Sequence, residues 1–305
     1  MWALAQDYPA RPIRLVVAAA PGGTLDVEAR IVGLKLSEVL GQSVVIEDRA
    51  GASGIVAAES VAKATPDGYT VLWEASDFIT ISSLMPHMSI DPGAALLAVA
   101  MVSDSPLVIV ARTDARFSTL NELVAAAKSN PSGLTYATYG IATSNNVVGQ
   151  WIAEAAHIRM LHVPYHSGPA AVQGVMAGDV DLAIVAPANV YPALTEGHKI
   201  KVIALTGARH PTYLPLWPTL SEGGLPIDAN ISTGLFAPAG TPPAVVKRLD
   251  EGIDRTLKDQ SVRKQLVNIG FEPQYLPAVE FGNRIHGVKV RYDQIIRTVG
   301  MRKEQ

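Results

Sequence analysis

The sequence contains no cysteine among its 305 residues. This absence excludes disulfide bonds, thiolate metal ligands and a cysteine nucleophile, and it is compatible with an oxidising compartment, where free thiols are a liability. Charged residues make up only 17% of the chain and the net charge is −3, without a basic block, so nucleic acid is not expected as a partner. No apolar run reaches the roughly 18–20 residues that a membrane-spanning helix needs.

Apolar residues, by contrast, make up 48% of the chain, which indicates a compactly folded protein. The length exceeds one typical hydrophobic core and predicts two domains. Strand-like runs alternate with helix-like runs, as is typical of parallel sheets covered by helices on both faces. Expected strands are 15–20, 44–47, 70–73, 107–111, 135–138, 160–163, 182–185 and 201–205, and expected helices are 27–40, 54–63, 120–128, 146–156, 170–177, 243–257, 262–266 and 279–299. The irregular stretches 76–106 and 211–239 are expected to hold inter-domain crossings and surface loops.

The turn Pro21-Gly22-Gly23 follows an apolar strand-like run and leads directly into a helix-like run. Free backbone N–H groups in such a turn, together with the helix dipole, attract an anion. The alternative is a tight connection in which glycine only supplies a positive φ. Thr24 is expected either to cap the helix or to offer its hydroxyl to the anion, and Asp26 to complement the helix dipole.

A second glycine turn, with Gly51, Ser53 and Gly54, repeats this strand-to-helix pattern. In a doubly wound sheet both turns fall at the carboxyl edge of the strands, where ligands bind. Neither turn has the glycine spacing of a dinucleotide site or the Lys-Ser/Thr ending of a P-loop, so no nucleotide cofactor is expected. Arg49 is expected to pair with a neighbouring acid rather than with a ligand.

The second half of the chain holds a third turn of this kind, with Thr143, Ser144 and Asn145 at the start of a helix. Hydroxyl and amide groups at a helix start cap the helix and can also bind an anion. Capping explains these residues on their own. The binding interpretation gains weight because each domain then carries the same type of turn.

A fourth turn contains His162, His166 and Ser167. The two histidines lack an accompanying carboxylate, so no metal site is expected. A hydrolase using Ser167 with His166 would need a nucleophile elbow and an acid that orients the base, and neither is evident.

Acidic side chains occur at or just past predicted strand ends, namely Glu74, Asp77 and Asp104. They would face either a ligand ammonium group or solvent. Tryptophans such as Trp73 belong more often to a core or a rim than to a ligand platform, although a tryptophan lining the site would favour an aromatic ligand.

A series of motifs extends along nearly the whole chain. They are Tyr8-Pro9-x-x-Pro12-Ile13-Arg14, Pro21-Gly22-Gly23-x-x-Asp26-x-x-Ala29-Arg30, Asp48-Arg49-Ala50-Gly51-Ala52-Ser53-Gly54, Ala64-Thr65-Pro66-Asp67-Gly68-Tyr69-Thr70, His162-Val163-Pro164-Tyr165, Met176-Ala177-Gly178-Asp179-Val180-Asp181-Leu182, Pro218-Thr219-Leu220-Ser221-Glu222-x-Gly224-Leu225-Pro226 and Ala237-Pro238-Ala239-Gly240-Thr241-Pro242. In this order the motifs resemble the Bug-type periplasmic receptors of tripartite tricarboxylate transporters.

The resemblance implies an α/β fold, namely a two-lobed periplasmic binding protein of type II, the Venus-flytrap kind, with two doubly wound sheets joined by two crossings. Lobe one is expected at 6–106 and 230–305, and lobe two at 107–229. The ligand is expected in the cleft between the lobes, with its carboxylate on the Pro-Gly-Gly turn. The implied ligand-binding residues are Gly22, Gly23, Thr24, Leu25, Asp26, Ser53, Glu74, Thr143, Ser144, Asn145, Tyr165, Ser167 and Ala186.

The chain departs from the family pattern near the expected cleft. The departures are Trp73-Glu74 in place of small residues, Ala142-Thr143-Ser144-Asn145-Asn146 in place of Gly-Ser/Thr-x-x-His, His166-Ser167 in place of Lys or Arg and Gly, and Val185 or Ala186 in place of an acid. If Glu74 and Asp77 point inward, they would repel a di- or tricarboxylate. A monocarboxylate with an amine or an aromatic ring would then fit better, with Trp73 and Glu74 at the rim of the site.

The expected function is a non-catalytic, monomeric receptor without metal or cofactor. It would capture a small organic carboxylate (a mono-, di- or aromatic acid) in the periplasm and deliver it to a membrane permease. Ala3-Leu4-Ala5 fits the pattern before a signal-peptidase cut, with most of the signal absent from this numbering, although an ordinary terminus explains these residues equally well. Two alternatives stay open: a ligand-dependent sensor that docks to a membrane histidine kinase, and the hydrolase that uses Ser167 with His166.

Overall fold

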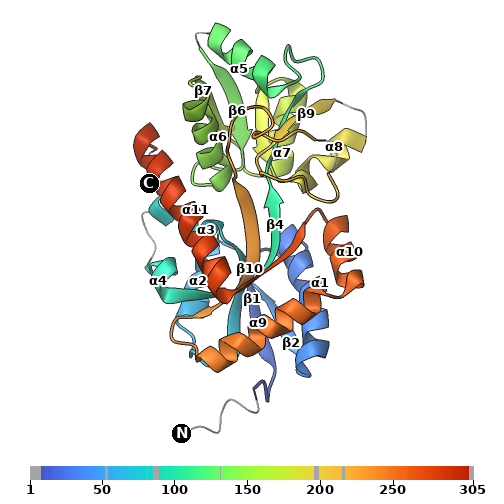
Figure 1. Cartoon of the computed structure of the whole chain (residues 1–305), viewed down its shortest axis with the longest axis vertical. Helices are drawn as coiled ribbons and strands as arrows, with labels where there is room; N and C mark the ends of the chain where they lie inside the picture. The colour runs from blue at the N-terminus through green and yellow to red at the C-terminus, as the bar shows by residue number, and fades with distance from the viewer. Residues whose placement is uncertain are drawn as a thin grey trace. The chain divides into compact units, whose positions relative to one another are not determined.

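The computed structural model describes residues 8–51, 54–80, 82–84, 89–130, 132–195, 199–214 and 217–301. The chain forms two compact units. Unit 1 comprises Met1–Ser82, Pro86–Asp104 and Ser232–Val290, and unit 2 comprises Ser83–Met85, Ser105–Ile231 and Arg291–Gln305. Three long elements run from one unit into the other, namely β4 (Leu96–Pro106), β10 (Asn230–Pro238) and α11 (Ala278–Val299) (Figure 1). The sequence predicted two such crossings, and the final helix makes a third.

Unit 1 is built on a six-stranded sheet with the order β11-β4-β10-β3-β1-β2. Its other strands are β1 (Ile13–Val17), β2 (Val44–Asp48), β3 (Thr70–Ala75) and β11 (Pro273–Pro277). β1 is parallel to both β2 and β3, whereas β10 is antiparallel to β3 and β11 is antiparallel to β4. The alternation of strand-like and helix-like runs indicated parallel sheets, and the structure shows that this sheet is mixed. A parallel neighbour requires a crossover connection, and β10 instead enters unit 1 directly from unit 2.

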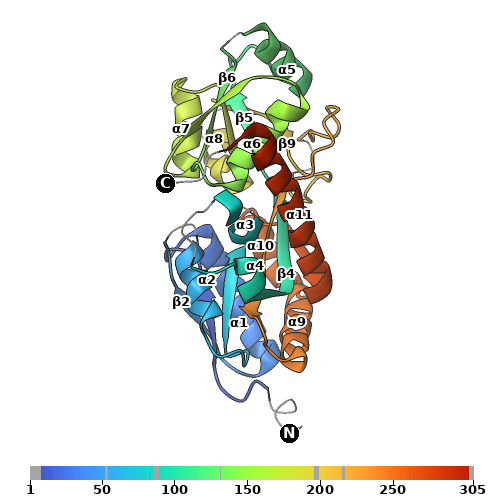
Figure 2. The same ribbon diagram turned by 90° about the vertical axis from the view of Figure 1, so that its left-hand side faces the viewer.

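Helices cover both faces of this sheet. α1, α9 and α10 pack on the face that carries Leu15 and Trp73, while α2, α3 and α11 pack on the face that carries Val16 and Leu72 (Figure 2). The alternation follows from the two-residue period of a strand. The helices of unit 1 other than α11 are α1 (Thr24–Leu40), α2 (Ile55–Ala62), α3 (Asp77–Thr80), α4 (Pro92–Ala95), α9 (Pro243–Leu257) and α10 (Gln260–Asn268).

The carboxyl ends of β1 and β3 lie side by side. Val17 pairs with Trp73 in the parallel register, and the Ala18 N–H donates to the Trp73 carbonyl at 3.2 Å. The turn after β1 and the first residues after Trp73 therefore share one edge of the sheet, the edge at which open α/β sheets bind ligands.

Unit 2 is built on a five-stranded sheet with the order β7-β6-β8-β5-β9, in which β6 is parallel to β7 and β8 and β5 is antiparallel to β8 and β9. Tyr136 of β6 packs against α6 at Gly149, whereas the next residue, Ala137, belongs to the core formed with α7. α6 and α7 therefore cover opposite faces. The elements are η2 (Ser82–Leu84), β5 (Val108–Arg112), α5 (Leu120–Ser129), β6 (Leu134–Thr138), α6 (Ser144–Ala155), β7 (Met160–Pro164), α7 (Gly168–Ala177), β8 (Leu182–Val185), η3 (Pro187–Asn189), α8 (Tyr191–Thr195) and β9 (Ile200–Leu205).

The end of α11 differs from the sequence-based boundaries, which placed residues 230–305 in lobe one. The structure groups residues 291–301 with unit 2. There the Arg291 guanidinium lies 5.4 Å from the ring centroid of Trp151, Tyr292 is buried, and Asp293 accepts a hydrogen bond from Ser83 at 2.6 Å. These contacts fix the last turns of the helix to unit 2.

Candidate functional site

The backbone N–H groups of the Pro-Gly-Gly turn form hydrogen bonds with neighbouring residues of the same segment. Gly22 has a φ of +79°, and its N–H donates to Asp26 Oδ2 at 2.7 Å. The Gly23 N–H donates to the Ala20 carbonyl at 3.0 Å. Both glycine N–H groups are therefore used within the turn, and the expectation that they are free for an anion is wrong.

The unused donors lie one residue further along, in the first turn of α1. Gly23 is the N-cap and, among the described residues, no side chain caps this helix. The N–H groups of Thr24, Leu25 and Asp26 consequently have no acceptor within the helix. The side chain of Leu25 packs against the core of unit 1, so Leu25 offers only its backbone to a ligand. The candidate anion site of unit 1 is this row of N–H groups at the positive end of the helix dipole.

Asp26 stabilises the turn through a hydrogen bond and an ion pair. Its carboxylate is buried, accepts from Gly22, and forms an ion pair with Arg30 at 2.6 Å, while Arg30 also reaches Asp48 at 2.8 Å. Burial raises the pKa of Asp26, but the hydrogen bonds from Arg30 and from the Gly22 N–H outweigh it and hold the pKa below its ordinary value. Asp26 therefore stays ionised and neutralised within the turn, as a dipole-complementing residue does.

Glu74 is the most unusual of the predicted site residues. Ser53, another predicted ligand-binding residue, lies outside the described residues. Glu74 is 7% exposed, and its Oε1 accepts the Ala75 N–H at 2.8 Å. Its Oε2 is buried and has no partner among the described residues. Burial, with a smaller contribution from the negative charge of Asp77, raises the pKa of Glu74 well above its ordinary value.

Trp73 does not lie at a rim. It is fully buried in the core of unit 1, and its Nε1 donates to Glu28 Oε2 at 3.1 Å. Glu28 Oε1 accepts from Ser103 at 2.8 Å and from Thr233 at 2.7 Å. The sequence analysis missed this network. Glu28 could have been found, because it occupies the apolar stripe that continues through Val32 in α1, where an acid must find buried donors.

Two other charged candidates from the sequence are engaged in structural pairs. Asp104 is buried and receives two hydrogen bonds from the Arg284 guanidinium, both at 2.8 Å, and one from Ser232 at 2.6 Å. Arg49 pairs with Glu47, as expected. Neither side chain offers a free charge to a ligand.

In unit 2 the N-terminus of α6 follows β6 in the same way as α1 follows β1. Thr143 is the N-cap, and its hydroxyl both accepts from the Asn146 N–H at 3.3 Å and donates to the Gly140 carbonyl at 3.0 Å. Thr143 is therefore occupied by capping. The hydroxyl of Ser144 and Oδ1 of Asn145 are buried and have no partner in the described part of the chain.

Asn145 is held in a fixed orientation by its other amide atom, because its Nδ2 donates to the Ile184 carbonyl at 2.9 Å. The N–H groups of Ser144 and Asn145 have no acceptor within the helix. The first turn of α6 thus combines two N–H groups that lack acceptors within the helix with two side-chain oxygens that lack partners among the described residues. It is the candidate site of unit 2.

The remaining predicted residues of unit 2 have local structural roles. Ser167 is the N-cap of α7, and its hydroxyl accepts from the Ala170 N–H at 3.3 Å. The Tyr165 hydroxyl lies against the backbone of α7 at Gly174. Ala186 precedes η3 and accepts from the Asn189 N–H at 3.0 Å.

The two histidines of the fourth predicted turn, His162 and His166, lie in different environments. His162 is half-buried, shares a hydrogen bond of 2.8 Å with Thr138, and has a pKa lowered to about 4 by burial. His166 is exposed, and no hydrogen bond joins it to Ser167 within the described ranges. The described residues hold no cluster of three or more potential metal ligands. None of the described helices is both long and apolar enough to cross a membrane.

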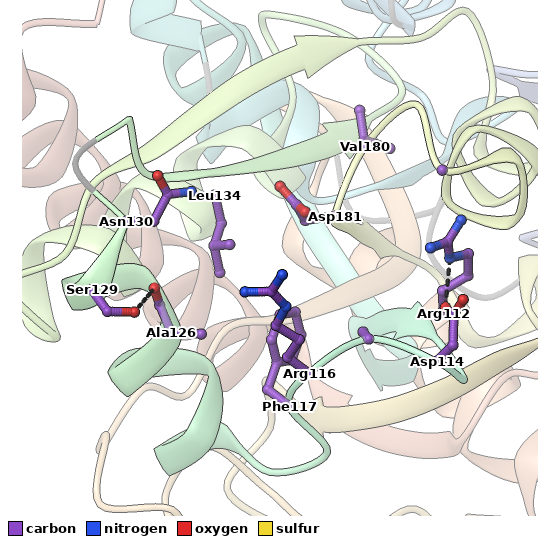
Figure 3. Close-up of a pocket in the computed structure, with 12 residues that line it drawn as sticks. Arg112, Asp114, Arg116, Phe117, Ala126, Ser129, Asn130, Leu134, Val180 and Asp181 are labelled. Atoms are coloured by element: carbon purple, nitrogen blue, oxygen red, sulfur yellow. Dashed lines mark hydrogen bonds and ion pairs between the residues drawn. The ribbon is translucent and has the colours of Figure 1, made fainter.

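A polar hollow of about 610 Å³ in unit 2 lies away from all predicted site residues. Arg112 pairs with Asp114 at its wall, and Arg116 extends toward its centre (Figure 3). Its other lining residues include the C-terminal ends of α5 and α7, at Asn130 and Gly178. Helix C-termini carry partial negative charge, which opposes carboxylate binding at that part of the wall.

Comparison with known proteins adds an independent finding. The model of the TctC family, described as the tripartite tricarboxylate transporter family receptor, matches residues 28–301. Protein BugT of Bordetella pertussis is 32% identical over 279 residues, which cover 88% of this chain and 83% of BugT.

Two solved structures from Rhodopseudomonas palustris are also similar to this chain. Rpa4515 with adipate superposes with a TM-score of 0.82 at 27% identity, covering 97% of this chain and 99% of that one. MatC (Rpa3494) with bound malate superposes with a TM-score of 0.76 at 27% identity, covering 95% and 100%.

Proposed function

Because this chain belongs to the tripartite tricarboxylate transporter receptor family, whose members are periplasmic solute-binding proteins, we propose that it binds a small organic carboxylate and delivers it to the membrane permease of a tripartite transporter. The predicted Bug-type resemblance and the periplasmic-binding-protein fold are both confirmed. The adipate and malate bound to two structural neighbours support a carboxylate as the ligand.

The observation that carries the proposal is the uncapped N-terminus of α1. Three consecutive N–H groups, those of Thr24, Leu25 and Asp26, lack acceptors within the helix, and no side chain of the described residues occupies the cap position. A carboxylate can accept from two of these N–H groups at once and complement the helix dipole. Charge compensation of this kind needs no buried arginine.

The first turn of α6 is the candidate ligand-binding site of unit 2 in this proposal. Ser144 and Asn145 each hold a buried oxygen that no described residue satisfies. A ligand hydroxyl or ammonium group would satisfy Asn145 Oδ1, which can only accept, whereas the Ser144 hydroxyl can donate or accept.

We assign no catalytic role to this chain. The Ser167 hydroxyl is occupied by capping α7, and no hydrogen bond connects it to His166 in the part of the chain that the structure describes. A nucleophilic serine needs such a base within hydrogen-bond distance. The receptor acts as a monomer in this proposal.

The test removes the N–H group of Thr24, and a control variant accounts for the loss of the threonine side chain. Proline is tolerated at the first position of a helix, and Gly23, with φ −66° and ψ 157°, already has the extended conformation required before a proline. Thr24→Pro should therefore fold normally but lose a hydrogen bond to a charged ligand group, which weakens carboxylate binding by about 10- to 100-fold.

Thr24→Ala is the matched control, because it removes the side-chain hydroxyl and keeps the N–H. Both variants are titrated calorimetrically with the carboxylate, adipate and malate included, that most raises the melting temperature of the wild type. Equal affinities of Thr24→Pro and Thr24→Ala would show that the N–H groups of α1 do not bind the carboxylate.

A further inference from the structure

Glu74 is positioned between two strand-to-helix turns of unit 1. It follows Trp73 at the carboxyl end of β3, beside Ala18 at the end of β1. On its other side is Gly54, the N-cap of α2, with a φ of +88°. A Cβ atom built on Gly54 would lie 2.2 Å from Glu74 Oε2 and 3.5 Å from Ala18 Cβ. The glycine therefore leaves the space that the carboxyl group occupies, directly at the start of α2.

The hydrogen bonds of Glu74 determine which atom can carry a proton. Oε1 accepts the Ala75 N–H, so the proton of a neutral carboxyl group belongs on Oε2. Oε2 is buried, and no described residue accepts from it or donates to it. A neutral Glu74 is thus a hydrogen-bond donor that has no acceptor in the described part of the chain.

The surroundings of Glu74 favour this neutral form. The residues against it from β1, β10 and α2 are Ala18, Gly234 and Gly54, none of which ionises. Among the described residues, Asp77 of α3 is the ionisable group whose charge acts on Glu74, and that charge is negative. Burial without a cationic partner disfavours a carboxylate, in agreement with the raised pKa.

We infer that Glu74 is a ligand-binding residue that donates a hydrogen bond from Oε2 to a second oxygen of the ligand, and that it thereby selects carboxylates that carry a further carboxylate or hydroxyl oxygen. This inference rests on the proposed function. It reverses the sequence-based expectation that Glu74 repels a dicarboxylate, because a neutral carboxyl group attracts an acceptor oxygen. An ammonium group, which has only donors, does not satisfy the neutral form.

The experiment compares ligands of one length that differ at one end: adipate has a second carboxylate, hexanoate a methyl group and 6-aminohexanoate an ammonium group. Malate is added as a shorter acid with further oxygens. Binding is measured calorimetrically at about pH 6 for the wild type, Glu74→Gln and Glu74→Met. Glutamine keeps an acceptor for the Ala75 N–H and a donor in place of Oε2, whereas methionine fills the same space without a donor.

The inference predicts that the wild type binds adipate or malate at least about tenfold more tightly than hexanoate, as expected for one hydrogen bond to a charged acceptor. Glu74→Gln should retain this preference and Glu74→Met should lose it. As the pH is raised until Glu74 ionises, wild-type affinity for the diacid should fall, whereas Glu74→Gln affinity should not.

Several results would overturn the inference. If Glu74→Met binds the diacid as tightly as Glu74→Gln, a buried water and not the ligand satisfies Oε2. If the wild type prefers 6-aminohexanoate, Glu74 is an ionised partner of an ammonium group. If hexanoate binds and both adipate and malate do not, the second-oxygen requirement is wrong while the proposed function survives. If no carboxylate binds to any of the proteins, the proposed function fails together with the inference.

Discussion

At the scale of single residues, buried oxygen atoms without described partners lie in the first turn of α6 and against the N-cap of α2. Ser144 Oγ, Asn145 Oδ1 and Glu74 Oε2 are shielded from solvent and have no hydrogen-bond partner among the described residues. Leaving such a group unsatisfied costs about 1–3 kcal/mol, so folded proteins retain few of them. Two of the three atoms lie in the first turn of α6 and the third lies against the N-cap of α2. Their cost is offset if a ligand supplies the missing partners.

Ser144→Ala separates a binding role from a structural one. The Ser144 hydroxyl makes no hydrogen bond in the described structure, so its removal should leave the free energy of unfolding unchanged within about 0.5 kcal/mol or raise it. Carboxylate affinity should fall by about tenfold, as for one lost hydrogen bond. Urea denaturation and calorimetric titration measure the two quantities.

Thr143→Ala is the control for this prediction, since Thr143 caps α6. It should lower the free energy of unfolding by about 1 kcal/mol. If Ser144→Ala destabilises the protein as much as Thr143→Ala and leaves affinity unchanged, the Ser144 hydroxyl is structural.

At the scale of elements, α1 is fixed to the sheet of unit 1 through Glu28. This one carboxylate joins α1 to β3 through Trp73, to β4 through Ser103 and to β10 through Thr233. The hydroxyl oxygens of Ser103 and Thr233 also lie 2.6 Å apart. The helix whose N-terminus holds the proposed carboxylate is therefore positioned by three strands at once.

Glu28→Gln should change how stability depends on pH. Burial raises the pKa of Glu28 from 4.5 to about 7, although hydrogen bonds from Thr233, Ser103 and Trp73 oppose the rise. The folded state therefore binds more protons than the unfolded state between these two values, and the stabilisation due to the protonated form is lost as the pH rises through about 7. The advantage of the wild type over Glu28→Gln should shrink by on the order of 3 kcal/mol from about pH 4.5 to about pH 7.

Glu38→Gln, at an exposed position of the same helix, controls for the loss of one negative charge. Chemical denaturation of all three proteins across this pH range provides the measurement. A constant difference between wild type and Glu28→Gln would contradict the account of a buried, titrating Glu28.

Helices and strands whose apolar residues follow one clear helical or strand period were predictable from the sequence. Elements in which polar residues or prolines interrupt that pattern were not. α9 and β8 occur where the pattern placed them. β10 was missed because Ser232, Thr233 and Gly234 interrupt its apolar pattern, yet the two hydroxyl groups are buried because they serve Asp104 and Glu28. β11 was missed because prolines stand at both of its ends. Whether these two segments form strands depends on partners that are distant in the sequence, and a local pattern cannot show such partners.

The candidate site was predictable in its location but not in its chemistry. The turn before α1 and the turn before α6 were recognised, because glycine and hydroxyl residues between a strand and a helix have a local signature. The sequence could not show that Gly22 and Gly23 use their own N–H groups, since the acceptors are Asp26 and Ala20 in a folded turn. Nor could it show that burial makes Glu74 a donor rather than a repelling charge.

At the scale of the whole molecule, each unit has the same arrangement: a strand, a polar turn, and a helix whose first N–H groups lack acceptors. A chain of the tripartite tricarboxylate transporter receptor family that repeats this arrangement is suited to hold an anion by backbone dipoles. The central claim is that the protein binds a small carboxylate reversibly and leaves it unchanged.

Calorimetric titration with adipate, malate and aromatic monocarboxylates, followed by analysis of the recovered ligand, tests this claim most directly. The account predicts one bound carboxylate per chain, recovery of the ligand intact, and a rise in the free energy of unfolding of about 2.7 kcal/mol at 100 times the Kd. Absence of binding to every carboxylate, or recovery of a converted product, would contradict it.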